Sequence, residues 1–189
     1  MDALQQHNLL RFADYLEREK KPKEIPAHWP ATQLAACLAD VEPLQRGALA
    51  LVSNRAAPGA EIATGISMTV QTLRPGQGTA PHSHSFWHIY IVTSGRGHVY
   101  LGADQDKQAL APNDVLYLPP WSEHRFECDT AEDLILYTLQ NLPQLAALGA
   151  LVRQEPDSDM TVMFKTPPAV VRKSQTTDIT DHSTALSDS

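Results

Sequence analysis

Residues 76–95 read Gly76-Gln-Gly-Thr-Ala-Pro-His82-Ser-His84-Ser-Phe-Trp-His88-Ile-Tyr-Ile-Val-Thr-Ser-Gly95. Side chains at positions i and i+2 of a β-strand point to the same face of a sheet. His82 and His84 can therefore reach one ion if this segment is a strand. Neutral imidazole is a good ligand for divalent iron, nickel, copper and zinc. The spacing thus predicts a metal site.

A second segment, Leu118-Pro-Pro-Trp-Ser-Glu-His124-Arg-Phe-Glu, brings a further histidine from another predicted strand. An isolated His-x-His pair is more often a half-exposed surface feature than a metal site. Here the pair follows a Pro-Gly turn, precedes a strand that ends in glycine and is joined by this later histidine. We therefore predict a metal centre with His82, His84 and His124 as the core ligands and His88 as a fourth ligand.

The number of histidine ligands decides which chemistry the predicted metal can perform. Three histidines leave three positions of an octahedral ion, enough for a chelating substrate together with dioxygen. Four leave only two. His88 must then leave the metal, or act from outside its ligand shell, if substrate and dioxygen both bind there. If His88 stays bound, dioxygen must react outside the metal shell, or the ion acts as a Lewis acid in a lyase, isomerase or hydrolytic reaction.

The sequence around the histidines predicts an all-β fold. Short apolar runs alternate with Gly, Pro, Asn and Asp turns, a texture typical of an antiparallel sandwich or jelly roll and not of a βαβ array. The predicted strands are 48–53, 62–73, 86–93, 98–101, 107–110, 115–118, 125–128 and 134–139.

Both histidine segments resemble the motifs of the cupin superfamily. Its first motif places a glycine before a His-x-His pair, then a glutamate and a final glycine; Gly76, His82, His84 and Gly95 match, and His88 stands at the glutamate position. The second motif is matched in part, with Asn113, Trp121 and Cys128 in place of Gly, Gly and Asn, and with Pro119 and His124 matching. The resemblance implies a double-stranded β-helix, or jelly-roll barrel.

Within the cupins, the segments are similar to the gentisate 1,2-dioxygenase-like ring-cleaving enzymes. This resemblance implies an Fe(II)-dependent dioxygenase that cleaves a small aromatic, phenolic acid or diketone with dioxygen; nickel, manganese, copper and zinc are alternative metals. Gln71 and Tyr90 are the candidate catalytic residues. Phe86, Trp87 and Trp121 are candidates for an aromatic wall around the substrate.

Other functions of the same barrel stay open. The metal could polarise a carboxylate in a lyase or isomerase, with Tyr90 or His88 moving a proton. A non-catalytic cupin that binds a ligand is a third possibility. His98, Glu123 and Cys128 are expected to be structural. The sequence contains neither a Gly-x-Ser-x-Gly nucleophile elbow nor a Walker phosphate loop.

The expected organisation has three parts. Residues 1–46 form an N-terminal helical extension with helices at 3–20 and 31–40. Residues 47–165 form the cupin barrel, with one C-terminal helix near 142–152 and an edge strand at 161–165. Residues 166–189 are rich in Ser, Thr and Asp and are expected to form a flexible tail.

Composition narrows the partners and the compartment. The 189 residues suit a single barrel, and the net charge of −7 without a basic run argues against nucleic acid. The two cysteines, Cys37 and Cys128, and the absence of a leader pattern or a long apolar run favour the cytoplasm and no membrane contact. A small-molecule substrate is expected, and a homodimer, because closed two-fold assemblies are the commonest.

Overall fold

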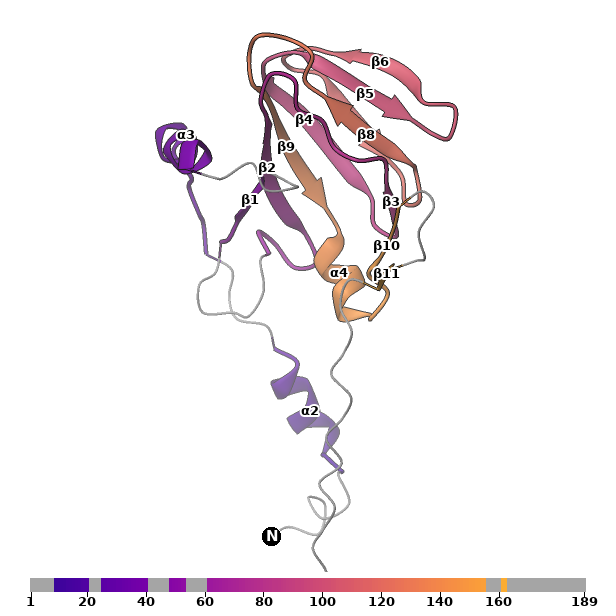
Figure 1. Ribbon diagram of the computed structural model, residues 1–189. Coiled ribbons are helices and arrows are strands. Elements are labelled where there is room, and N and C mark those ends of the chain that lie inside the picture. The colour runs from indigo at the N-terminus through magenta and orange to yellow at the C-terminus, as the bar shows by residue number, and fades with distance from the viewer. Residues whose placement is uncertain (1–8, 21–24, 41–47, 54–60, 156–160, 163–189) are drawn as a thin grey trace, which may run out of the picture.

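In the computed structural model, β-strands form a barrel with short helices outside it (Figure 1). The structure describes residues 9–20, 25–40, 48–53, 61–155 and 161–162. A five-stranded sheet has the order β1-β2-β9-β4-β7, and two three-stranded sheets have the orders β6-β5-β8 and β11-β10-β3. The all-β prediction is confirmed.

The elements have the following bounds. The helices are α2 (Phe12–Arg18), α3 (Ala31–Asp40) and α4 (Leu142–Ala147), and the strands are β1 (Ala48–Leu51), β2 (Ser67–Leu73), β3 (Ser83–His84), β4 (His88–Ser94), β5 (Gly97–Leu101), β6 (Asp106–Leu110), β7 (Val115–Leu118), β8 (His124–Glu127), β9 (Leu134–Gln140), β10 (Val152–Gln154) and β11 (Thr161–Val162). Among the described residues, no helix combines the length and the apolar character needed to cross a membrane.

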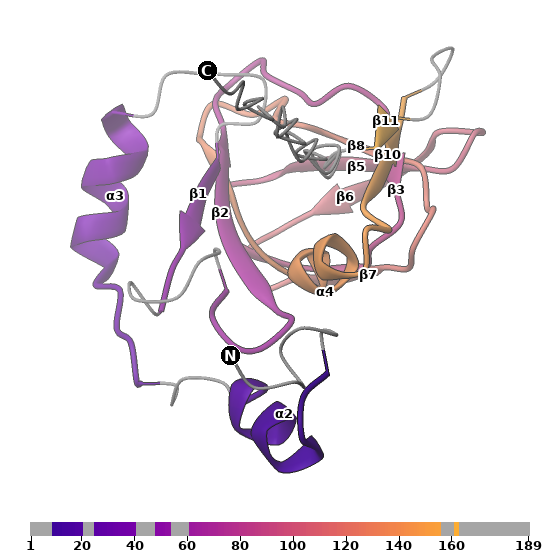
Figure 2. The ribbon, with the colours of Figure 1, turned by 90° about the horizontal axis from the view of Figure 1, so that it is seen from below.

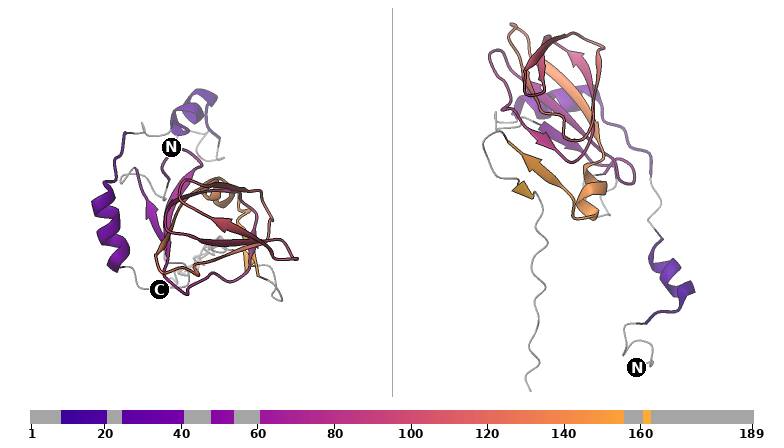
Figure 3. Two further views of the ribbon diagram at one scale, coloured as in Figure 1. Left: turned by 90° about the horizontal axis from the view of Figure 1, so that it is seen from above. Right: turned by 90° about the vertical axis from the view of Figure 1, so that its right-hand side faces the viewer.

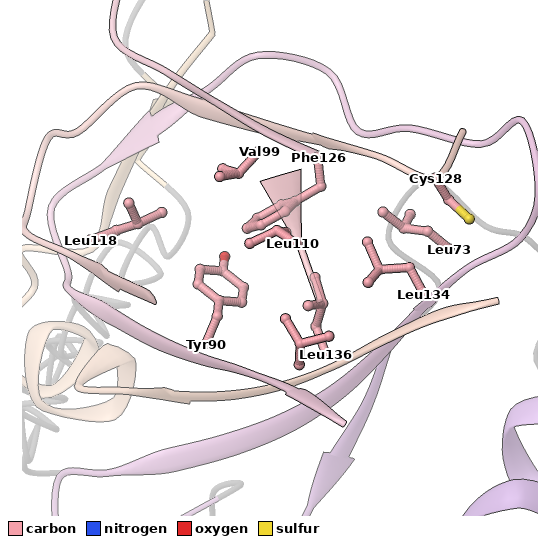
Figure 4. Packing of buried hydrophobic residues seen from close by; sticks show 10 residues of the cluster. Leu73, Tyr90, Val99, Leu110, Leu118, Phe126, Cys128, Leu134 and Leu136 are labelled. Atoms are coloured by element: carbon pink, nitrogen blue, oxygen red, sulfur yellow. The ribbon is translucent and has the colours of Figure 1, made fainter. Parts of the chain in front are cut away.

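The main core lies between the five-stranded sheet and the β6-β5-β8 sheet, which face each other when the barrel is viewed from above (Figure 3). Alternate residues of β9 and β8 are buried, as expected for strands with one face toward a core. Figure 4 shows Tyr90 among apolar side chains of both sheets, with its hydroxyl directed into the barrel. The Tyr90 hydroxyl is therefore a polar group inside the otherwise apolar core.

A smaller cluster covers the outer face of the five-stranded sheet. Leu34 of α3 packs with Leu51 and Val70, and Trp29 and Tyr137 lie against them. Figure 2 shows α3 running beside β1 and β2 on this side. The N-terminal segment thus covers a sheet face that would otherwise be exposed.

Some elements differ from their predicted bounds. The helix expected over 3–20 is described only as Phe12–Arg18, with residues 9–11 outside it and residues 1–8 outside the described part. The strand expected from residue 62 begins at Ser67, because residues 62–66 close a turn in which the Ile62 amide donates to the Ile66 carbonyl. Residues 163–165 of the expected edge strand, and the expected tail at 166–189, also lie outside the described residues.

The C-terminal helix is shorter than the predicted 142–152 because Gly149 ends it. Gly149 has a φ of +66°, its amide donates to Ala146, and the Ala150 amide donates to Leu145. This pattern is the Schellman motif, which stops a helix after a left-handed glycine. The chain then re-enters the barrel as β10, a strand that the sequence analysis did not predict and whose first residue, Val152, it placed at the end of the helix.

The turn after β4 gives a first testable prediction. Gly95 has a φ of +74°, and a Cβ there would collide with the Asp133 carbonyl oxygen. Gly95→Ala is expected to reduce the free energy of unfolding by about 3 kcal/mol or more, because left-handed strain and a backbone clash add together. Urea unfolding measures it. Gly102→Ala is the control: φ is +66° but no atom lies within 4 Å, so only about 1 kcal/mol of strain is expected. Equal losses in the two variants would contradict the clash.

Candidate metal centre

Backbone pairing places His82 and His124 side by side. The two residues form an isolated antiparallel bridge in which each amide donates to the other's carbonyl, at 3.1 Å and 2.9 Å. Directly opposed residues of such a pair project to the same face. Their ring centroids are accordingly 4.4 Å apart. The main chain therefore fixes the Cα positions of these two histidines next to each other.

His84 is held by a different set of contacts. Its ring stacks on Phe86 with centroids 3.8 Å apart, and its carbonyl accepts a hydrogen bond from the Trp121 amide at 2.7 Å. Trp121 has a φ of +66°, an unfavourable conformation for a bulky residue, and a cost of about 1–2 kcal/mol is typical. That conformation directs the Trp121 amide at His84.

The three histidines share one protonation pattern. The Nδ1–H of His82 donates to the Ala80 carbonyl, that of His84 to Phe86 and that of His124 to Ser122, at 2.9, 2.7 and 2.9 Å. A hydrogen bond from Nδ1–H to a carbonyl fixes the tautomer whose Nε2 lone pair is free for a metal. Metal-ligating histidines are usually oriented in this way.

The residues present fit a metal ion. One nitrogen each of His82, His84 and His124 lies within 4.8 Å of the other two. The His84 Nε2 is buried and has no hydrogen-bond partner among the described groups. A buried polar atom without a partner costs about 1–3 kcal/mol, and a metal ion at this place would relieve that cost. His82, His84 and His124 can therefore hold a metal ion.

Burial keeps these imidazoles neutral. Desolvation, reinforced by neighbouring histidines, lowers the pKa of His82 and of His84 to about 3 and that of His88 to about 2. Desolvation also lowers the pKa of His124. Neutral imidazole is the form that binds metals, so no proton has to leave at neutral pH.

The lowered pKa values predict how stability depends on pH. In the unfolded chain these histidines bind a proton near pH 6.5, whereas the folded metal-free protein does not. The free energy of unfolding should therefore have its full value above about pH 6.5. As the pH is lowered from there, it should decrease by up to about 1.4 kcal/mol per pH unit for each histidine. Urea unfolding at several pH values between about 6.5 and about 5 measures this decrease, because Asp and Glu side chains titrate mostly below this range.

The matched variant for this measurement is His84→Phe, which removes one of the titrating groups and keeps an aromatic ring beside Phe86. Its unfolding free energy should depend less steeply on pH than that of the wild type. A wild-type stability that does not change over this range would contradict neutral, buried histidines.

His88 lies next to the three histidines but makes other contacts. Its ring centroid is 4.4 Å from that of His84. Its Nε2–H donates to Gln140 Oε1 at 2.7 Å, and its Nδ1 accepts from the Tyr90 hydroxyl at 2.5 Å. The same hydroxyl lies 3.5 Å from the His124 Nε2. Gln140, His88 and Tyr90 thus form a buried hydrogen-bonded chain that ends beside the metal centre.

The Tyr90 hydroxyl is suited to donate a proton in a hydrogen bond. Burial raises the pKa of the phenol above its ordinary value, so the hydroxyl stays protonated at neutral pH. Because His88 donates its own N–H to Gln140, its other nitrogen can only accept, which orients the Tyr90 hydrogen toward it.

The other predicted site residues differ in their contacts and in their exposure to solvent. Phe86 stacks on His84, whereas Trp121 is 48% exposed and contributes its amide. Gln71 of β2 is paired with Leu136 of β9, and Tyr90 of β4 is paired with Thr138, two residues further along β9. Gln71 and Tyr90 therefore project from the same face of the sheet. Trp87 is half-buried, and its amide donates to Asn141.

Two residues near the centre were absent from the sequence prediction. Gln140 follows the alternating buried positions of β9, and this pattern could have revealed it if the predicted strand had been one residue longer. Arg153 pairs with His84 across the β10–β3 ladder. Only recognition of a strand after Gly149 could have indicated it.

Comparison with known proteins identifies the barrel. A family model described as "Cupin domain" matches residues 69–139. The 5-nitrosalicylic acid 1,2-dioxygenase of Bradyrhizobium sp is 26% identical over 98 residues, which are 52% of this chain and 46% of that relative.

Solved structures agree on the fold. The salicylate 1,2-dioxygenase of Pseudaminobacter salicylatoxidans matches with a TM-score of 0.71 at 19% identity, over 87% of this chain and 49% of that one. A structure of this enzyme's adducts with gentisate gives a TM-score of 0.71 at 19% identity, over 87% and 48% of the two chains. This chain spans about half the length of these relatives. The segment 69–139, which carries His82, His84 and His124, thus matches a cupin domain, and the whole barrel has the fold of these solved structures.

Proposed function

We propose that this protein is a divalent-metal-dependent dioxygenase, with Fe(II) as its metal, that cleaves a small aromatic acid or phenol. The proposal is carried by the three Nδ1 hydrogen bonds, which leave each Nε2 lone pair available. The Nε2 of His84 is buried and has no partner within the described part of the chain. The similarity to dioxygenases that act on salicylate-type aromatics supports the reaction class.

A bound Fe(II) would supply positions at which a chelating substrate and dioxygen meet, and it would transfer charge between them. The chain's own residues do the remaining work. His82, His84 and His124 would hold the ion, while the apolar side chains around Tyr90 keep water away from the interior.

Tyr90 and His88 are proposed to act without a permanent bond to the metal. Of the alternatives that the sequence left open, the hydrogen bonds of His88 favour a place outside the ligand shell, since both of its ring nitrogens are in use. When substrate binds, the Tyr90 hydroxyl would turn its single hydrogen from His88 Nδ1 toward an oxygen of the substrate or of dioxygen. His88 Nδ1 is then left as an acceptor that can take up or return a proton. Gln71 is kept as a candidate for a substrate contact.

A lyase or isomerase is the second candidate function, favoured by the same Tyr90–His88 pair. Such a pair can move a proton without any oxidant. Dioxygen distinguishes the two: turnover under argon would support the lyase or isomerase, and turnover only with consumption of dioxygen would support the dioxygenase.

The test begins with elemental analysis of the purified full chain, followed by oxygen-electrode measurements with salicylates, catechols and 1,3-diketones. Iron together with substrate-dependent oxygen uptake is the expected result. Iron without uptake on any of these compounds would move the proposal to the lyase. We further propose a cytoplasmic homodimer; the free state of Cys37 and Cys128 agrees with a reducing compartment.

A further inference from the structure

An arginine outside the matched cupin segment lies beside the metal centre. Arg153 is the middle residue of β10, and the antiparallel register sets it directly opposite His84 of β3. Opposed residues of an antiparallel pair project to the same face of the sheet. Arg153 therefore lies on the face from which His84 enters the centre.

The charge of Arg153 acts at the centre. Its side chain is only 17% exposed, so solvent screens the guanidinium less than at an open surface. An anion bound at the three histidines, on the face that Arg153 shares with His84, would be stabilised by this charge.

One acidic partner lies on the outer side of this arginine. The Arg153 Nε–H donates to Glu155 Oε1 at 3.2 Å, and the Glu155 side chain is 53% exposed. A guanidinium carries five N–H donors in a planar fork, which matches the two oxygens of a carboxylate. The geometry suits an arginine that is oriented from the surface by Glu155 and presents its charge to the interior.

We propose that Arg153 binds the carboxylate of the substrate and thereby selects 2-hydroxybenzoates over catechols and neutral phenols. This inference rests on the proposed function, because it assumes that the substrate binds at the three-histidine centre. A carboxylate ortho to a hydroxyl gives the substrate two oxygens for a metal. It also gives the guanidinium a full negative charge to pair with.

Ser85 is the residue that positions β10. Its amide donates to the Val152 carbonyl at 3.0 Å, its hydroxyl donates to the Ala150 carbonyl at 2.7 Å, and the Val152 amide donates to that hydroxyl at 3.0 Å. These bonds hold the strand directly before Arg153. Ser85→Ala removes the two hydroxyl bonds and keeps the guanidinium, so it tests placement separately from charge.

The experiment measures binding, without turnover, on the full chain loaded with zinc, which does not undergo redox reactions. Salicylate and its neutral amide, salicylamide, are titrated by calorimetry. Arg153→Gln is expected to weaken salicylate binding roughly 10- to 100-fold, the range typical of a charge-assisted hydrogen bond. Salicylamide should change by less than roughly 2-fold, since it offers no charge to the guanidinium.

Further variants complete the design. Arg153→Lys keeps the charge without the fork and should bind salicylate with intermediate affinity. Ser85→Ala should lose part of the preference for salicylate over salicylamide. Arg74→Gln, an exposed arginine in the turn after β2, removes the same charge away from the centre and should bind both compounds as the wild type does.

Two results would overturn the inference: wild-type affinity for salicylate in both Arg153 variants, or an equal loss of salicylate and salicylamide in Arg153→Gln. A wild-type protein that does not bind salicylate would overturn it as well. Failure of the proposed reaction is a separate outcome. Arg153-dependent salicylate binding by the zinc form, without oxygen uptake by the iron form, would refute the dioxygenase and leave the carboxylate site in place.

Discussion

Metal-free protein is the expected result of replacing His84 by alanine. The affinity for divalent iron should fall by more than roughly 100-fold, because changes in residues that only support a ligand already cost 10- to 100-fold. The Nε2 of His84 is buried and has no partner among the residues that the structure describes, so the variant loses no hydrogen bond of this nitrogen to them. Elemental analysis after dialysis against iron gives the readout, and oxygen uptake should disappear with the metal.

The control for this variant is another histidine of the barrel. The Nδ1 of His98 on β5 lies 2.8 Å from Asp129 Oδ2, and the His98 side chain is 24% exposed. His98→Ala should retain iron at the wild-type level. Circular dichroism of both variants checks that the barrel is folded. A folded His84→Ala protein that keeps the wild-type amount of iron would remove His84 from the ligand set.

The second large effect is expected from Tyr90→Phe. This change removes one oxygen atom that lies 2.5 Å from His88 Nδ1 and 3.5 Å from His124 Nε2. Loss of a positioned proton donor typically lowers a rate by 10²- to 10⁴-fold. We therefore expect kcat to fall roughly 100-fold or more, while the iron content stays at the wild-type level because the three histidines are untouched.

Tyr100→Phe is the matched control, since the Tyr100 hydroxyl donates to Glu127 on the β5–β8 ladder, away from the three histidines. Its kcat should equal that of the wild type. If Tyr90→Phe turned over at the wild-type rate, the Tyr90–His88 pair would have no part in the reaction. Loss of iron in Tyr90→Phe would instead assign Tyr90 a role in holding the centre.

The sequence predicted the parts of this protein that local spacing controls. A His-x-His pair on a strand must point one way, and short apolar runs separated by Gly, Pro, Asn and Asp turns predict short strands. The cupin fold was implied by the resemblance of the two histidine segments to cupin motifs, and the family match over residues 69–139 agrees with it. The convergence of His82, His84 and His124 needed one further step, the pairing of two segments far apart in the sequence.

Strand register is what the sequence could not supply. His88 was predicted as a metal ligand, but only the β4–β9 register shows that Gln140 lies opposite it and takes one of its nitrogens. As a ligand, His88 stays a prediction. Arg153 was missed for a related reason: the helical composition of residues 142–148 continued the predicted helix past Gly149, where the left-handed backbone in fact starts a new strand.

The main-chain bridge between His82 and His124 sets the positions of these two residues without depending on the chemical nature of their side chains. Two reciprocal amide–carbonyl bonds set both Cα positions, and these bonds are the same for any residue other than proline. A carboxylate or a thiolate at either position would start from the same point as the imidazole. The preference of the barrel for one cation over another can therefore be retuned by single substitutions, with no rebuilding of the scaffold.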